Sequence, residues 1–262
     1  TTSATDALEM AAILLDIKPG DEVIVPSYTF SSTPNAFLLR GAKIIFADSH
    51  DRHPNINEDQ ISSLITSKTK AIVPVHYSGV ACNMDKICAI AEKHNIAVVE
   101  DAAQALCSRY KDKMLGKIGD FGAFSFHETK NIISGEGGAL LVNHEPFRLR
   151  AEVIREKGTN RSQFFRGEVD KYTWQDVGSS FLPGELIAAF LWAQFENAKD
   201  ITQKRLSSWN YYHSQLAFLE VSGALRRPLI PDYCEHNAHL YYILLPESVS
   251  REKVLSKMKN DC

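Results

Sequence analysis

The 262-residue sequence contains no apolar run of the ~20 residues that a membrane-spanning helix needs, so we expect no membrane segment. It has no excess of basic residues either, because 29 Lys and Arg stand against 32 Asp and Glu, for a formal charge of −3. Without a basic field, neither a nucleic acid nor an anionic membrane is expected as a partner. The 44% hydrophobic and 23% charged residues are typical of an ordinary globular protein.

The five cysteines are odd in number and form no CxxC pair, which argues against a disulfide framework. We therefore expect reduced thiols and a cytoplasmic protein. Two short segments imitate metal sites, ADSHDRH at residues 47–53 and CEHNAH at residues 234–239. A zinc site needs four ligands of compatible geometry, and neither segment has a second half elsewhere in the chain, so we predict no metal.

Short β-branched runs alternate with longer helical patterns, which predicts an α/β fold with a mostly parallel central sheet and crossover helices. The first four runs are apolar on both faces, as expected of strands that helices cover on each side. Strands are predicted at 22–26, 43–47, 71–75, 96–100, 122–126 and 138–142, and helices at about 6–15, 31–40, 58–66, 84–94, 145–157, 185–197 and 200–217.

The pattern changes after Gly223, where two prolines precede a strand-like LYYILL at residues 240–245. We predict a large domain over residues 1–219 and the start of a small α+β domain over residues 220–262.

The first helix is expected to begin near Asp6, with Asp6 and Glu9 spaced as in a capping box. Its first residues, SATDA, are small and offer free backbone amides of the kind that bind anions. A plain capped surface helix is the alternative.

Two segments carry the residues with chemistry. VVEDAAQ at residues 98–104 places Asp101 at the carboxyl end of a strand, where α/β proteins bind ligands. FSFHETKNIISGEGG at residues 124–138 adds the Ser125 hydroxyl, the Lys130 amine and a glycine-rich turn. A carboxylate, an amide three residues later and a lysine 29 residues beyond the carboxylate are the equipment of a pyridoxal phosphate site.

Six motifs occur together in the chain, namely SATDALEM, PSYTF, PVHYSG, VVEDAAQ, SFHETKN and SGEGGALLVN. Through them the chain resembles the DegT/DnrJ/StrS family of sugar-nucleotide aminotransferases, which has fold type I of the pyridoxal phosphate enzymes, over essentially its whole length. Residues 155–180 are similar to one branch, the dTDP-4-amino-4,6-dideoxygalactose transaminases of bacterial surface polysaccharides such as enterobacterial common antigen. Family members extend further at both ends, so Thr1 and Cys262 are expected to be cuts.

The resemblance implies roles at the cofactor ring. Lys130 matches the lysine that forms the Schiff base and then moves a proton at the substrate carbon. Asp101 matches the carboxylate that keeps the pyridine nitrogen protonated, and Gln104 matches the amide near the ring hydroxyl. Tyr28 stands where the family has an aromatic side chain stacked on the ring.

The resemblance also implies how the phosphate is held. Thr5 and Asp6 would present backbone amides, and Ser125 would add its hydroxyl. Family dimers place a residue of the neighbouring subunit near the phosphate; here the matching position is Ser180, where Asn is commoner. The arginine expected two positions later is Leu182, which leaves open how the cross-subunit wall is built and what receives the carboxylate of the amino donor. A homodimer with sites at the subunit interface is expected.

Four further residues keep open roles, and one is assigned to packing. His76 makes either a substrate contact or a structural one, and His127 makes either a structural hydrogen bond or a catalytic one. Tyr77 is assigned to packing. Arg161 and Arg166 are candidates for contacts with a nucleotide diphosphate.

The activity that the resemblance implies is transamination of a nucleotide-linked 4-keto-6-deoxy sugar, dTDP-4-keto-6-deoxyglucose, with L-glutamate as donor. A C3-specific sugar aminotransferase shares every motif quoted above and stays open as an alternative. A sugar dehydratase of the same family carries His in place of the lysine, so Lys130 argues against it. A catalytically silent fragment is the remaining alternative.

Overall fold

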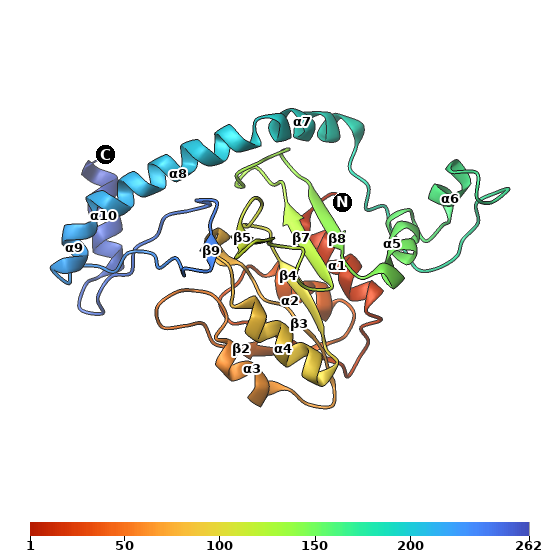
Figure 1. Cartoon of the computed structure of the whole chain (residues 1–262), viewed down its shortest axis with the longest axis horizontal. Helices are drawn as coiled ribbons and strands as arrows, with labels where there is room; N and C mark the ends of the chain where they lie inside the picture. Colours follow the sequence, from red (N-terminus) through yellow and green to blue (C-terminus); the bar gives the residue numbers. More distant parts are fainter. Residues whose placement is uncertain (262) are drawn as a thin grey trace.

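A six-stranded sheet forms the centre of the protein, with helices on both faces (Figure 1); the structure is a computed structural model that describes residues 1–261. Five neighbouring strands run parallel and β8 is antiparallel to β7, as predicted for a mostly parallel sheet. The strands in spatial order are β2 (Lys43–Ala47), β1 (Glu22–Pro26), β3 (Thr69–Ile72), β4 (Ala97–Asp101), β7 (Phe121–Ser125) and β8 (Gly138–Val142).

Two hydrophobic layers cover the sheet, because successive side chains of a strand point to opposite faces. Val23 and Val25 of β1 are buried in one layer, whereas Ile24 between them is buried in the other. The first layer contains residues of α1 (Ala4–Leu14), α2 (Ser32–Leu38) and α5 (Arg148–Arg155), and the second contains residues of α3 (Glu58–Leu64) and α4 (Met84–His94).

Helix α1 begins at Ala4, earlier than predicted, and its N-cap is Ser3. Ser3 has an extended backbone, and its Oγ accepts a hydrogen bond from the Asp6 amide at 3.0 Å. A serine in this position satisfies one of the free amides of the first turn. The predicted capping pair of Asp6 and Glu9 is therefore wrong.

Three strand predictions need correction. β2 lies at the edge of the sheet and is covered incompletely, because Ile44 and Ile45 are only partly buried and Phe46 is 56% exposed. The run predicted at 71–75 forms β3 two residues earlier and ends before Pro74, which has no amide to donate. The LYYILL segment forms no strand, and one isolated bridge joins Leu244 to Arg226.

A helical arm follows the sheet domain and runs along one side of it (Figure 1). It contains α6 (Arg161–Phe165), α7 (Glu185–Glu196), α8 (Ala198–Gln215) and α9 (Ala217–Val221), and the chain ends in α10 (Arg251–Asp261). Between α9 and α10 the chain returns to the domain, where β9 (Cys234–Glu235) pairs with β5 (Arg109–Tyr110), itself paired with β6 (Lys113–Met114). Short 3₁₀ helices are η1 (Tyr77–Gly79) and η2 (Glu145–Phe147). The boundary at residue 220 stays a prediction.

None of the helices within residues 1–261 combines the length and the apolar character that crossing a bilayer would require.

Candidate active site

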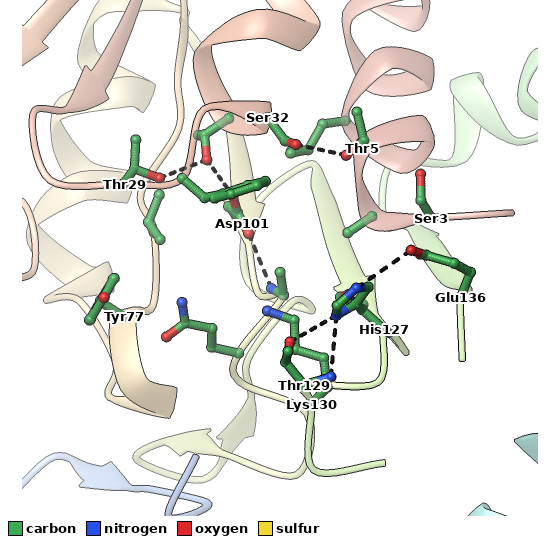
Figure 2. Close-up of a pocket in the computed structure, with 18 of the residues that line it drawn as sticks. Ser3, Thr5, Thr29, Ser32, Tyr77, Asp101, His127, Thr129, Lys130 and Glu136 are labelled. Carbon is green, nitrogen blue, oxygen red and sulfur yellow. Dashed lines mark hydrogen bonds and ion pairs between the residues drawn. The ribbon is translucent and has the colours of Figure 1, made fainter. Parts of the chain in front are cut away.

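One cavity of about 640 Å³ opens where β4 and β7 end, beside the start of α1 (Figure 2). Polar side chains from five segments of the chain meet there, as expected at the carboxyl edge of a parallel sheet. Six of the predicted site residues line it, namely Thr5, Tyr28, Asp101, Gln104, Ser125 and Lys130. Asp6 and Ser180 do not line it.

Asp101 is the last residue of β4, and its carboxylate is held by two donors. Oδ2 accepts a hydrogen bond from Thr33 Oγ at 2.7 Å, and Oδ1 accepts one from the Ala103 amide at 3.1 Å. Thr33 is fully buried and shares a 2.7 Å hydrogen bond with Thr29. These contacts fix the orientation of the carboxylate. Thr33 was not predicted, because nothing in its local sequence indicates a contact with Asp101, 68 residues further along the chain.

Lys130 lies in the loop after β7, and its amide donates to the His127 carbonyl at 2.9 Å. Its Nζ makes no hydrogen bond or ion pair within residues 1–261. Burial lowers the pKa of Lys130, and the negative charge of Asp101 opposes this effect in part. A lowered pKa increases the fraction of neutral amine, which is the nucleophilic form.

Removing the charge of Asp101 is expected to lower the pKa of Lys130 further. The Asp101→Asn variant of the cofactor-free protein should therefore acylate at Lys130 with a midpoint at lower pH than the wild-type protein. Peptide mass spectrometry after pulses of an amine-reactive reagent at several pH values measures the midpoint, with Lys93 on α4 as the internal reference. A midpoint that stays in place or rises would contradict the expected coupling of the two groups.

The start of α1 offers an anion site. The Asp6 amide is taken up by Ser3 Oγ, while the amides of Ala4 and Thr5 have no acceptor among the described residues, and both of these residues line the cavity. Ser125 Oγ lies close by and accepts the His127 amide at 3.3 Å, which leaves its own proton free to donate. Of the two predicted amide donors, the structure therefore brings Thr5 to the cavity and not Asp6.

Gly138 of β8 lies directly against the start of α1, beside the cavity. A Cβ at residue 138 would lie 2.2 Å from the carbonyl carbon of Ser3. Only glycine allows β8 to pass so close to the start of α1.

Two tyrosines form an aromatic wall. The ring of Tyr28 is half exposed and packs against that of Tyr77 with centroids 4.9 Å apart. Burial raises the pKa of Tyr77 to about 12, with a contribution from Tyr28, so Tyr77 is a neutral phenol at physiological pH. The assignment of Tyr77 to packing alone was too narrow, because it lines the cavity.

His127 and Gln104 hold fixed positions on the other walls. His127 Nδ1 is 2.9 Å from Thr129 Oγ, and Nε2 is 3.5 Å from a carboxylate oxygen of Glu136 (Figure 2). Gln104 Oε1 accepts the Ser78 amide at 2.6 Å. His127 therefore makes a structural hydrogen bond while it lines the cavity.

His76 and Glu100, which directly precede the cavity residues Tyr77 and Asp101 in the chain, form a fully buried pair at 3.0 Å. His76 Nδ1 accepts the Cys82 amide, which assigns the ring proton to Nε2 facing Glu100. Glu100 also accepts the amides of residues 116, 118 and 119 at 2.7–2.8 Å. Burial alone would raise the pKa of Glu100, but the hydrogen bonds from His76 and the backbone outweigh it, and the pKa is lowered. His76 thus makes a structural contact, and Glu100 fixes the end of β4 one residue before Asp101.

The Glu100→Gln substitution is expected to destabilise the protein by about 3 kcal/mol, roughly 10 °C in Tm. The new amide would direct N–H groups at backbone N–H groups that now donate to the carboxylate. Differential scanning fluorimetry measures the loss. Glu58→Gln is the matched control, because Glu58 is also buried but is held by the side chains of His50 and Asn83 alone. Equal losses in the two variants would count against the role of the backbone donors.

The remaining predicted residues lie away from the cavity. Ser180 is exposed and forms an isolated bridge with Glu156 at the end of α5. Arg161 pairs with Glu156, and Arg166 with the carboxylates of residues 152 and 168, so both guanidinium groups are already engaged. In residues 1–261 no group of three His, Cys, Asp or Glu side chains could hold a metal ion.

Taken as a donor set, the cavity fits pyridoxal phosphate. It holds a lysine with a lowered pKa and no protein partner among the described residues, and a carboxylate held by two donors. The free amides at the start of α1 and the Ser125 hydroxyl at the end of β7 suit a phosphate.

Comparison with protein families and curated proteins gives a consistent picture. The model of the DegT/DnrJ/EryC1/StrS aminotransferase family matches residues 1–262. The spore coat polysaccharide biosynthesis protein SpsC of Bacillus subtilis is 35% identical over 99% of this chain and 67% of its own length. The GDP-perosamine synthase of Caulobacter vibrioides is 32% identical over 98% of this chain and 67% of its own length.

Solved structures of aminotransferases have the same fold as this chain. The aminotransferase from Psychrobacter cryohalolentis superposes with a TM-score of 0.93 at 30% identity, covering 99% of this chain and 69% of that one. The pyridoxal phosphate form of the sugar aminotransferase Spr1654 from Streptococcus pneumoniae has a TM-score of 0.88 at 25% identity, covering 99% and 70%. The chain therefore spans about two thirds of the length of these relatives.

Proposed function

Because the chain belongs to the DegT/DnrJ/EryC1/StrS aminotransferase family, whose cofactor is pyridoxal phosphate, we propose that it transfers an amino group from L-glutamate to a nucleotide-linked 4-keto-6-deoxy sugar. The preferred substrate is dTDP-4-keto-6-deoxyglucose, converted in the cytoplasm to dTDP-4-amino-4,6-dideoxygalactose for a surface polysaccharide. The observation that carries the proposal is that the Lys130 amine and the Asp101 carboxylate share one cavity with the free amides of α1.

When bound, pyridoxal phosphate supplies the carbonyl that takes up the amino group and a ring that accepts electrons. Lys130 Nζ is the group that holds the cofactor covalently, and its neutral amine moves a proton to and from the substrate carbon. Asp101 holds a proton at the pyridine nitrogen. Gln104 would contact the ring hydroxyl and Tyr28 would pack on the ring. Burial of Lys130 favours its neutral form and so favours both of its tasks.

At the phosphate, this chain's residues bind and orient. The amides of Ala4 and Thr5 would donate to its oxygens, and the Ser125 hydroxyl would donate a third hydrogen bond. The dipole of α1 adds only ~0.3–2 kcal/mol, so the hydrogen bonds do most of the holding.

The charges on the cavity walls support a site shared by two subunits. Among the described residues that line it, Lys130 is the single Lys or Arg, whereas Asp101 and Glu136 add two carboxylates. The cofactor phosphate, the diphosphate of a sugar nucleotide and a glutamate carboxylate would together bring several negative charges, which a single subunit would leave unpaired. We place the missing positive charge, and Ser180 near the phosphate, on the neighbouring subunit of a homodimer.

Helix α7 is a suitable contact surface for that dimer. None of its twelve residues is buried, although its sequence is ELIAAFLWAQFE, and Leu186 and Trp192 are 88% and 69% exposed. An apolar cavity of about 290 Å³ lies between α7 and Phe126. Exposed apolar surface of this kind marks an interface. Sedimentation equilibrium tests the assignment, and a stable monomer that binds the cofactor would contradict it.

The assay offers the purified protein pyridoxal phosphate, L-glutamate and dTDP-4-keto-6-deoxyglucose, and follows 2-oxoglutarate. NMR then assigns the aminated carbon and its stereochemistry. An amine at C4 supports the proposal, and an amine at C3 would refute the position while leaving the family intact. Cofactor binding without any turnover would favour the catalytically silent alternative.

A second candidate substrate has a specific reason behind it. The similarity to GDP-perosamine synthase makes a GDP-linked 4-keto-6-deoxy sugar the alternative nucleotide. A parallel assay with GDP-4-keto-6-deoxy-D-mannose compares kcat/KM for the two. A higher value for the GDP sugar would overturn the dTDP assignment.

A further inference from the structure

The segment of residues 234–239 crosses from the helical arm to the loops of the active site, and its side chains are engaged in contacts other than metal binding. Cys234 Sγ accepts the amide of Ala81 at 3.2 Å. The ring of His236 packs edge-on against Trp209 with centroids 4.5 Å apart. The polar residues that made this segment look like a metal site therefore attach it to the protein.

Asn237 is the most deeply buried residue of the segment, with 1% of its surface exposed. Its Nδ2 donates to the carbonyls of Gln104 and Leu106 at 2.9 and 2.8 Å. The main-chain carbonyl of Asn237 accepts a 2.8 Å hydrogen bond from Nδ2 of Asn131, the residue that follows Lys130. Asn237 thus joins the loop that contains Lys130 to the loop that contains Gln104.

A third loop meets the same side chain. A Cβ at Gly79 would lie 1.9 Å from Asn237 Oδ1, so only glycine fits there. The neighbouring Ser78 amide donates to Gln104 Oε1 at 2.6 Å. The 78–79 turn, the 104–106 loop and the loop of Lys130 are therefore packed around Asn237.

Arg205 of α8 binds the main chain of the 234–239 segment. It donates to the carbonyls of Ala238 at 3.1 Å and His239 at 2.5 Å. Ala238 has φ +52°, a conformation that costs energy for a residue with a Cβ and persists where the surroundings impose it. His239 Nδ1 lies 3.0 Å from Asn131 Oδ1, and burial, with Lys130 and Arg205 nearby, lowers its pKa to about 4, so the ring is neutral.

We propose that Asn237 is a positioning residue of the active site, which fixes the Lys130 loop relative to Gln104 without lining the cavity. The proposal rests on the proposed function, because only there do Lys130 and Gln104 act on one cofactor. Asn237 acts through Asn131 and through the backbone of the 104–106 loop. Residues beyond the sheet domain thereby complete a site whose chemistry is supplied by residues 3–136.

The Asn237→Ala substitution tests this without changing any charge. We expect the dissociation constant for pyridoxal phosphate to rise about tenfold, the effect of losing one or two net hydrogen bonds. Alanine keeps the main-chain carbonyl that Asn131 contacts, but it removes the two hydrogen bonds that attach residue 237 to the 104–106 loop. The segment should then shift and let water reach the Lys130 loop, so in the cofactor-free protein the acylation midpoint of Lys130 should move to higher pH by about half a unit.

Asn143→Ala is the matched control, because Asn143 Nδ2 also bridges two backbone carbonyls, those of Gly116 and Gly119. It should lower Tm and leave both measurements unchanged. The proposal is overturned if Asn237→Ala lowers Tm in the same way and changes neither the dissociation constant nor the midpoint.

If Asn237→Ala does not fold, the Asn131→Leu variant tests the proposal instead. It removes only the hydrogen bonds of the Asn131 side chain to Asn237 and His239. A raised midpoint supports the proposal and an unchanged one overturns it. The midpoint is measured at Lys130 itself, without cofactor or substrate. An absence of turnover in the wild-type protein would therefore refute the proposed function and still leave the test of Asn237 readable.

Discussion

Replacing Lys130 with alanine is expected to reduce kcat at least ~10⁴-fold, which in practice abolishes turnover. Lys130 is the single Lys or Arg among the described residues that line the cavity, so no other amine of this subunit is placed to take over the proton transfer that we propose for it. The visible absorbance of covalently attached cofactor should disappear at the same time. Initial rates of 2-oxoglutarate formation and an absorbance spectrum measure the two effects.

Two controls make the Lys130 result specific. Lys93→Ala, on the surface of α4, should leave the rate unchanged. Added methylamine should restore part of the activity of Lys130→Ala, because a small amine can enter the vacated space and move the proton. Turnover that persists in Lys130→Ala without added amine would refute the assignment of the site.

Replacing Asp101 with alanine is expected to lower kcat roughly 10²–10⁴-fold. The substitution removes the carboxylate that we propose to hold the pyridine proton, and it also leaves the buried Thr33 hydroxyl without its acceptor. Steady-state kinetics with glutamate as the varied substrate separates the two effects, because loss of the proton should lower kcat more than it changes KM.

Thr33→Val is the control for Asp101, since it removes the hydrogen bond and keeps the carboxylate. We expect kcat to fall about tenfold, the effect of losing one or two net hydrogen bonds. If Thr33→Val and Asp101→Ala reduced kcat equally, Asp101 would act through its geometry alone, and its role at the pyridine nitrogen would be wrong.

The sequence predicted the sheet and much of the candidate site because both depend on local order along the chain. Asp101 ends a buried strand and Lys130 follows another, and the ends of neighbouring parallel strands meet at one edge. Ser125 and Gln104 lie within three residues of such ends, so their arrival at the cavity followed from the same rule.

What the sequence did not predict depends on contacts between distant segments. Thr33 reaches Asp101 from a helix that begins 69 residues earlier in the chain, and the pairing of His76 with Glu100 requires the register of β3 and β4. The edge position of β2 could not be read from its apolar sequence, because spatial strand order differs from chain order. Ser180 keeps its predicted role as a hypothesis, since that role involves a second subunit.

The contact between Asn131 and Asn237 also bears on the timing of synthesis, because the two residues are 106 positions apart. At the ~5–20 residues per second of translation, about 5–20 s pass between the appearance of the first and the second. The strands of the sheet are all made before that interval ends, and they can pair without Asn237. During those seconds the nascent protein can have a folded sheet, but the Lys130 loop lacks its contact with Asn237. Cofactor capture is therefore expected to follow the emergence of residue 237, rather than to guide the collapse of the sheet.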